Sequence, residues 1–202
     1  RAEESAWFGV SYIGSRAALG LLPDGALDNA RRTDTQRSLA DHIADAGGDP
    51  AALRDDARHF DPATLGAYLE LHIEQGPVLE RSKIPIGIVN GVSGVCFLQV
   101  RYDGVANHSG TTPMDMRADA FAGLAAFANS IPATIAAHGT GQSRITIGKV
   151  ELQPNFAHTV PGSAEFSIIL RDTSEEVMRA LRADVLENVE AAAKVHGLKI
   201  SV

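Results

Sequence analysis

Apolar and polar positions follow two different periods along the chain. From Leu65 to Glu74 an apolar residue occupies every second position, which predicts a strand that stops at Gly76-Pro77. After position 93, alternating runs separate two long segments whose apolar residues have helical spacing. The resulting order, β-α-β-β-α-β, is typical of a split-βαβ, ferredoxin-like arrangement. We therefore expect an α/β protein with a domain boundary near residue 92.

The second part is predicted in most detail. The pattern predicts strands over 95–103, 144–152, 163–170 and 198–202 and helices over 111–137 and 173–196. Thr111 or Thr112 is expected to cap the first helix, and Pro132 is expected to end or kink it. Gly197 is a suitable stop for the second helix.

In the first part the elements are shorter. Apolar residues at helical spacing predict a helix over 31–46, and a second short helix is expected over 51–59 after a proline start. A turn of helix is expected at 77–81, again with proline at its start. Polar loops separate these elements.

Charge and composition exclude several classes of protein. The net charge is −7 and Lys and Arg form no basic run, so nucleic acid is not an expected partner. The single cysteine, Cys96, excludes an intrachain disulfide and fits a reducing, cytoplasmic compartment. No run of 18 apolar residues is present, and we expect no membrane span and no signal peptide. Because the chain begins with Arg1 rather than Met, we expect a processed, truncated or partly ordered product of a longer chain.

Candidate chemistry begins with the histidine in the first predicted strand. His72 lies among apolar positions, so its ring needs hydrogen-bond partners, as in a satisfied core histidine, or a metal. Gln75, at the turn, offers a donor and an acceptor to an amide or ureido group. Glu3 and Glu4 are adjacent carboxylates: either one ligates a metal while the other acts as general base, or both are simply solvated.

A second polar cluster lies between a predicted strand and a predicted helix. His108 is followed by hydroxyl residues near the expected helix start, which favours an anion or oxyanion site unless the hydroxyls only cap the helix. His158 lies in a polar loop between two strands. Arg171 follows the second of them and is a natural partner for a substrate carboxylate, although a lone arginine there is more often a surface charge.

Several motifs together carry a family resemblance. They are Glu3-Glu4, Glu70-Leu-His-Ile-Glu-Gln-Gly-Pro77, His108-Ser-Gly-Thr-Thr-Pro-Met114, Arg117-Ala-Asp-Ala120 and Val160-Pro-Gly162 with Arg171. The chain resembles the M20-type binuclear-metal amidohydrolases, in the branch that holds N-carbamoyl-L-amino acid hydrolases, allantoate amidohydrolases and β-ureidopropionase. The resemblance runs in order from residue 1 to residue 202.

The resemblance implies a role for each candidate. Glu3 matches the general base, Glu4 a ligand of one metal and His72 a ligand of the other. Gln75 and His108 match groups that contact the scissile amide or ureido end of the substrate, and Arg171 matches the residue that binds its carboxylate. The two divalent metals would be Zn, Mn, Co or Ni.

The resemblance also implies an organisation. Residues 1–92 would be part of a metal-binding catalytic α/β domain, and 93–202 a lid or dimerisation domain. That domain would form a homodimer and supply some groups to the partner subunit's site.

The chain departs from the family pattern at specific places. His158 stands where asparagine is usual, and Ile169 where an acid is frequent, so substrate preference is open. The remaining metal ligands of the family fall outside this sequence, so we expect the chain alone to be inactive. Two alternatives remain: an M20 aminoacylase or dipeptidase, and a non-catalytic dimerisation module.

Overall fold

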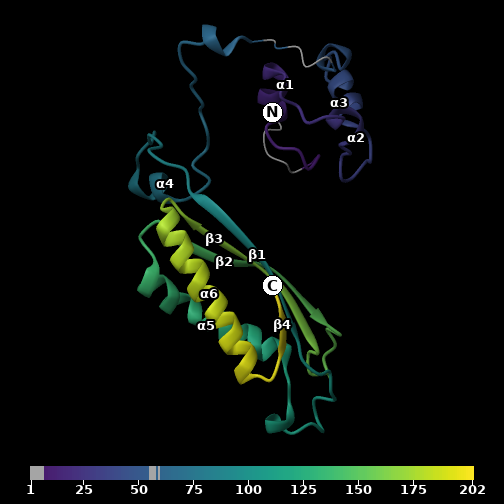
Figure 1. Cartoon of the computed structure of the whole chain (residues 1–202), viewed down its shortest axis with the longest axis vertical. Helices are drawn as coiled ribbons and strands as arrows, with labels where there is room; N and C mark the ends of the chain where they lie inside the picture. Colours follow the sequence, from purple (N-terminus) through teal and green to yellow (C-terminus); the bar gives the residue numbers. More distant parts are fainter. Residues whose placement is uncertain (1–6, 55–57, 59) are drawn as a thin grey trace. The chain divides into compact units, whose positions relative to one another are not determined.

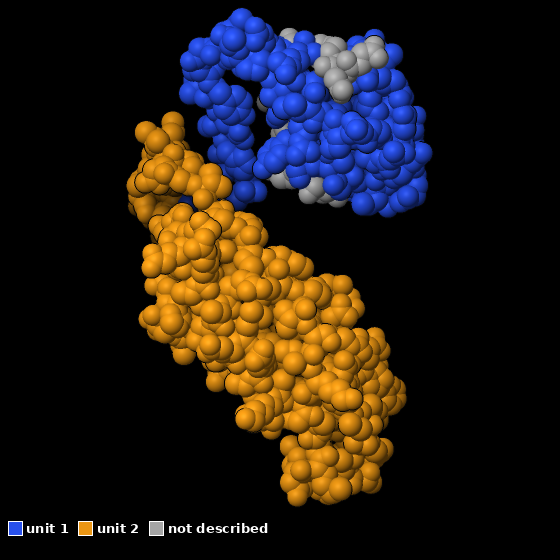
Figure 2. Space-filling model, viewed as in Figure 1, with its two compact units in different colours: residues 1–77 blue, residues 78–202 orange. Residues whose placement is uncertain are grey.

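The chain forms two compact units, Arg1–Pro77 and Val78–Val202, coloured separately in Figure 2. The computed structural model describes residues 7–54, 58 and 60–202. The division at residue 77 falls before the boundary near 92 that the sequence predicts.

The second unit is a four-stranded antiparallel sheet covered by two helices. Its strands are β1 (Gly94–Asp103), β2 (Arg144–Gln153), β3 (Ser163–Asp172) and β4 (Lys199–Ser201), in the spatial order β2-β3-β1-β4. The helices are α5 (Ala120–His138) and α6 (Glu175–Val195). The predicted element order is confirmed: β1-α5-β2-β3-α6-β4.

The sheet has one buried face because its apolar residues alternate. Val100 and Tyr102 of β1 lie beside Phe166 and Ile168 of β3, and all four are fully buried. Phe166 packs its ring against Tyr102 and against Phe127 of α5, with centroid distances of 5.2 and 5.9 Å. Both helices therefore cover the same face of the sheet (Figure 1). Residues of the opposite parity form a second face, which we call the open face.

Helix α5 begins later than predicted. Its N-cap is Asp119, whose carboxylate accepts hydrogen bonds from the backbone N–H groups of Phe121 (2.9 Å) and Ala122 (3.1 Å). The prediction that Thr111 or Thr112 caps this helix is therefore wrong. The residues between form a loop with a short 3₁₀ turn, η3 (Met114–Met116).

The proline in α5 does not end the helix. Pro132 lies inside it, and the helix continues to His138. Helix α5 is also long and apolar enough to cross a membrane by length and composition alone. Its Leu124 and Phe127, however, are buried in the core against the sheet, as in the core helix of a folded domain.

Helix α6 matches the predicted helix over 173–196 closely. Ser174 caps it by accepting from the backbone N–H of Val177, and Gly197, at φ 65°, follows its end. The Tyr102 hydroxyl donates to the carbonyl of Val189 at 2.7 Å, which ties α6 to β1.

The first unit is built from short helices around a small core. They are α1 (Ile13–Leu19), α2 (Ala26–Asn29), α3 (Leu39–Asp45), η1 (Ala51–Leu53) and η2 (Pro62–Thr64). The predicted helix over 31–46 begins only at Leu39, because Ser38 and Asp41 form a capping box there. The helix predicted over 51–59 is a 3₁₀ turn, and part of that range lies outside the described residues. A helical turn, α4 (Val78–Ser82), confirms the prediction for 77–81 but belongs to the second unit.

The predicted strand over 65–74 is wrong for this chain. The segment has no strand assignment and no ladder partner among the residues that the structure describes. Leu69, Leu71 and Ile73 are 93%, 95% and 74% exposed. A strand needs a neighbour for its N–H and C=O groups and a surface against which its apolar side chains pack. The sequence pattern is present here, but the described residues provide neither a paired strand nor burial of Leu69, Leu71 and Ile73.

Candidate functional site

The predicted site residues fall in separate places. Glu3 and Glu4 lie outside the described residues. His72 and Gln75 belong to the extended segment of the first unit, and His108, His158 and Arg171 belong to the second unit.

His72 and Gln75 lie on exposed backbone. The Nδ1 atom of His72 is 2.6 Å from the carbonyl oxygen of Ile73. A proton on Nδ1 would donate to that oxygen and leave the lone pair on Nε2, which is the tautomer that ligation through Nε2 requires. Gln75 has φ 56°, a left-handed conformation that turns the chain before Gly76-Pro77. The contact with Ile73 is thus compatible with His72 acting as a metal ligand through Nε2.

Two hollows lie in the first unit. A hollow of about 930 Å³ is lined mainly by apolar residues of α1 and α3 and is bordered by Tyr68, Glu70 and His72. The Tyr68 hydroxyl donates to Glu70 at 2.7 Å on this border.

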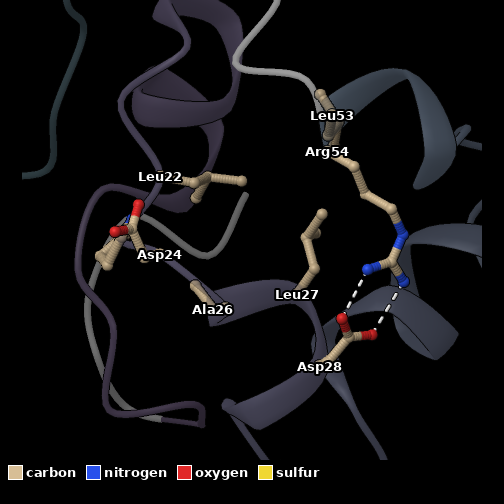
Figure 3. Close-up of a pocket in the computed structure, with 9 residues that line it drawn as sticks. Leu22, Asp24, Ala26, Leu27, Asp28, Leu53 and Arg54 are labelled. Atoms are coloured by element: carbon tan, nitrogen blue, oxygen red, sulfur yellow. Dashed lines mark hydrogen bonds and ion pairs between the residues drawn. The ribbon is translucent and has the colours of Figure 1, made fainter.

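The smaller hollow, about 180 Å³, is shown in Figure 3. At its rim the Arg54 guanidinium donates to both carboxylate oxygens of Asp28, at 2.5 and 2.8 Å. This hydrogen bonding lowers the pKa of Asp28 below its ordinary value. No predicted site residue lines this hollow within the described part of the chain. The ion pair ties α2 to the residue after η1 and is a structural feature.

His108 and His158 are brought together by two paired loops. The N–H of Ser109 donates to the carbonyl of His158 at 3.0 Å, and the N–H of Val160 donates to the carbonyl of Asn107 at 2.8 Å. His108 also forms an isolated bridge with Thr159. Both histidines are exposed. Sequence alone placed them in separate loops, and the structure makes them neighbours.

The hydrogen bond to the ring of His108 defines which ring nitrogen carries the proton. Its Nδ1 accepts from the backbone N–H of Gly110 at 3.1 Å. In the neutral ring the proton is then on Nε2, so that the exposed side chain presents an N–H donor. Such a donor can stabilise negative charge that develops on a carbonyl oxygen.

The loop after His108 is held by an arginine that sequence analysis did not assign a role. Arg117 donates to the carbonyl of Ser109 at 2.6 Å and to that of Thr112 at 3.0 and 3.1 Å. Thr112 in turn donates its hydroxyl to the carbonyl of His108 at 2.8 Å. Because α5 begins at Ala120, the helix start expected beside His108 is wrong, whereas an oxyanion site at His108 stays a prediction. In the sequence, Arg117 is marked only by its place in the motif Arg117-Ala-Asp-Ala120.

Arg171 lies at the other end of the sheet. It stands near the end of β3, on the open face, with Val95 of β1 and Arg144 of β2 as its direct cross-strand neighbours. The loop of His158 precedes the start of β3 at Ser163. Strands rise about 3.3 Å per residue, so Arg171 is about 27 Å along the sheet from Ser163. One chain therefore does not bring Arg171 together with His108 and His158.

The carboxylate beside Arg171 in sequence faces the opposite way. Asp172 is buried and accepts hydrogen bonds from the hydroxyls of Ser143 (2.6 Å) and Thr140 (2.7 Å) and from the N–H of Ser174 (2.8 Å). The hydrogen bond from Ser143 is the largest cause of a pKa below the ordinary value of this carboxyl, with those from Ser174 and Thr140 next. Asp172 thus joins the start of β2 to the start of α6.

The described residues do not build a metal centre. They contain no group of three or more His, Cys, Asp or Glu side chains placed to hold an ion. Of the predicted ligands, Glu4 lies outside the described residues and His72 belongs to no such group of three.

Comparison with known proteins identifies the class. Residues 90–197 match the family described as the peptidase dimerisation domain, which is more than half of the chain. The chain belongs to this M20 dimerisation-domain family.

Particular relatives extend the match over nearly the whole chain. The N-carbamoyl-L-amino acid amidohydrolase of Geobacillus stearothermophilus is 37% identical over 98% of this chain and 47% of its own length. The allantoate deiminase of Arabidopsis thaliana is 28% identical over 91% of this chain and 38% of its own. The chain spans about half the length of the curated relatives it matches.

Solved structures agree with the sequence comparison. A hydantoinase/carbamoylase family amidase from Burkholderia ambifaria has 30% identity and a TM-score of 0.83, over 99% of this chain and 47% of that one. A second such amidase, from Burkholderia phymatum, has 33% identity and a TM-score of 0.83, over 98% and 48%. The mixed α/β fold of this chain is therefore that of amidase structures.

Proposed function

We propose that the chain is part of a cytoplasmic, metal-dependent amidohydrolase that cleaves a linear C–N bond in N-carbamoyl-L-amino acids or in allantoate. The observation that carries this proposal is the similarity to an N-carbamoyl-L-amino acid amidohydrolase over 98% of the chain. Allantoate deiminases, which match over a similar share, keep the second substrate open.

The two parts of the chain would have different tasks. Residues 1–92 would belong to the metal-binding catalytic domain, and 93–202 would be a ferredoxin-like lid that also pairs two subunits. The βαββαβ order and the family match from residue 90 support this division.

The residue roles follow the chemistry available to each side chain. Glu3 would act as general base, and Glu4 and His72 would each ligate one of two divalent ions such as Zn or Mn, which would supply Lewis-acid chemistry when bound. Gln75 and His158 would contact the amide or ureido end of the substrate. The Nε2–H of His108 would donate to the carbonyl oxygen as negative charge develops there. Arg171 would bind the carboxylate.

The separation of these groups along the sheet supports a homodimer. His108 and His158 lie at one end of β3 and Arg171 lies at the other. A single small substrate cannot reach both ends of one sheet. Two copies related by a two-fold axis would let His108 of one subunit and Arg171 of the other serve the same site.

Assays on the full-length gene product test the activity. With Mn²⁺ or Zn²⁺ present, we expect release of ammonia from N-carbamoyl-L-amino acids or allantoate and little release of acetate from N-acetyl-L-amino acids. Preference for the N-acetyl substrates would instead indicate an aminoacylase. No turnover on any of them would contradict the proposal.

The 202-residue chain provides a further prediction. Purified alone with added Mn²⁺ or Zn²⁺, it should hydrolyse no N-carbamoyl amino acid, because the two ligands predicted in it, Glu4 and His72, cannot hold a binuclear centre. Ammonia release is the measurement, with metal and substrate without protein as the blank. Turnover above that blank would contradict this expectation.

The second candidate is a non-catalytic dimerisation module. The description of the matched family, a peptidase dimerisation domain, favours it. Such a module would form dimers, and the full-length gene product would hydrolyse none of the substrates above. The same assay, combined with the molar mass in solution, separates the two functions.

A further inference from the structure

On the open face of the sheet, some arginine and lysine side chains form ion pairs with carboxylates of the described residues and others do not. At the end nearest Asp103, Arg101 donates to Asp103 at 2.9 Å and lies 3.8 Å from Glu165. On β2, Lys149 pairs with Glu151 of the same strand at 2.6 Å. Arg101 and Lys149 thus each have a carboxylate partner.

The opposite end of the same face carries two arginines without such partners. Arg144 and Arg171 are direct cross-strand neighbours on β2 and β3, and both are exposed. Neither forms a salt bridge with any carboxylate that the structure describes. The nearby Asp172 faces the core, and its oxygens are occupied by Ser143, Thr140 and Ser174.

This arrangement is unfavourable without a bound anion. Like charges directly opposite each other on a sheet destabilise it. Arg144 donates through Nη1 to the carbonyls of Gly141 (2.9 Å) and Ser143 (2.7 Å), which restrains its side chain. Arginine presents a planar fork of donors that matches a carboxylate. A restrained guanidinium beside Arg171 is therefore suited to bind the same anionic ligand.

Apolar side chains border the two arginines on the open face. Val95 is the neighbour of Arg171 on β1, and Phe97 and Ile169 form the next cross-strand pair. Val95 and Phe97 are 56% and 59% exposed, and Ile169 is half-buried. A ligand whose carboxylate meets the arginines can thus lay an apolar group over these side chains.

We propose that Arg144 is a second carboxylate-binding residue beside Arg171, and that Val95, Phe97 and Ile169 contact an apolar side chain of the same ligand. The ligand class is an organic carboxylate with an apolar side chain. Its description as an N-carbamoyl-L-amino acid with an apolar side chain rests on the proposed function. The paired arginines and the apolar strip do not depend on it.

Binding can be measured on the 202-residue chain without turnover. Amide resonances are followed by NMR during titration with N-carbamoyl-L-leucine, with N-carbamoyl-L-leucinamide and with N-carbamoylglycine. We expect shifts around Val95, Arg144 and Arg171, with the acid binding about tenfold tighter than its uncharged amide. The glycine compound should also bind more weakly than the leucine compound. Equal affinity for the acid and the amide would overturn the proposal.

A matched pair of variants isolates Arg144. Arg144→Gln should weaken binding of N-carbamoyl-L-leucine about tenfold. Arg101→Gln, on the same face with the same change in charge, should bind as the unmodified chain does. Arg144→Lys, which keeps the charge and loses the planar fork, should fall between them. Equal affinities for Arg144→Gln and Arg101→Gln would overturn the assignment.

These outcomes are independent of catalysis. If the full-length protein hydrolyses none of the expected substrates but the acid still binds at Arg144, the proposed function fails and the inference stands. If hydrolysis is found and the acid and amide bind the chain equally, the inference fails and the function stands. A well-dispersed spectrum of each variant serves as the folding control, and the acid-to-amide comparison needs no variant.

Discussion

At the scale of single residues, the second unit depends on a few polar and small side chains at strand ends. Asp172 joins Thr140, Ser143 and the start of α6 through hydrogen bonds of 2.6–2.8 Å. Gly104 lies against the backbone of Ala118, where an added Cβ would be 2.0 Å from a carbonyl oxygen. These positions hold the loops that carry the candidate site residues.

Asp172→Asn should destabilise the second unit and flatten its acid unfolding profile. The pKa of the folded carboxyl is lowered by its donors, so the ionised form is favoured in the folded state. Its stabilisation is present above the unfolded pKa, about 3.9, and is lost as pH falls through the folded value. Thermal unfolding between pH 7 and pH 2 measures this. Glu187→Gln, an exposed change on α6, is the control, and an Asp172→Asn profile parallel to that of the unmodified chain would refute the role.

Gly104→Ala should destabilise the unit by about 1–3 kcal/mol, because the clash is with backbone rather than with a movable side chain. The N–H of Gly104 also donates to the carbonyl of Gly162, so the strand cannot shift freely. Gly141→Ala is the matched control, since nothing lies within 4 Å of its added Cβ. Chemical denaturation of both variants is the measurement, and equal midpoints would contradict the close approach.

At the scale of elements, the alternation of apolar residues specified the sheet and its helices, and local capping decided where the helices begin. The four strands and α6 follow the sequence pattern because each has a partner and a buried face. The pattern failed for α5 and α3, where Asp119 and Ser38 outcompeted earlier candidate starts. It failed for 65–74 because an alternating pattern without a neighbouring strand does not form a ladder.

The start of α5 can be tested directly. Asp119→Ala should lower the free energy of unfolding by about 1 kcal/mol, because it removes the acceptor for two helix N–H groups. Thr111→Ala, at the position where sequence analysis placed the cap, should have a smaller effect. Denaturant titration of both variants is the measurement. A larger loss of unfolding free energy for Thr111→Ala than for Asp119→Ala would support a helix start at Thr111 and contradict the start at Asp119.

The candidate site was only partly predictable from sequence. The motifs identified His72, His108 and Arg171 as candidates, yet no motif pointed to Arg144, the first residue of β2. Its relation to Arg171 depends on strand register, which sequence spacing does not define. The pairing of the His108 and His158 loops depends on hydrogen bonds between segments some fifty residues apart, and these too become visible only in the fold.

At the scale of the whole molecule, the central claim is that one functional site needs two copies of the chain. The loops of His108 and His158 lie at the Ser163 end of β3, and Arg171 is about 27 Å along that strand from Ser163. The family match to a dimerisation domain supplies a physical route to a shared site. In the segment 65–74, the apolar side chains of Leu69, Leu71 and Ile73 are exposed to solvent.

The most direct test mixes two inactive variants of the full-length gene product. His108→Ala and Arg171→Ala are purified separately, each expected to be nearly inactive, and are then mixed under conditions that exchange subunits. If the two groups serve one site from different subunits, half of the dimers are mixed and carry one intact site. Activity on an N-carbamoyl-L-amino acid should then recover to about a quarter of the unmodified level. If both groups acted within one chain, every site would lack one of them, and the absence of any recovery on mixing would contradict the account.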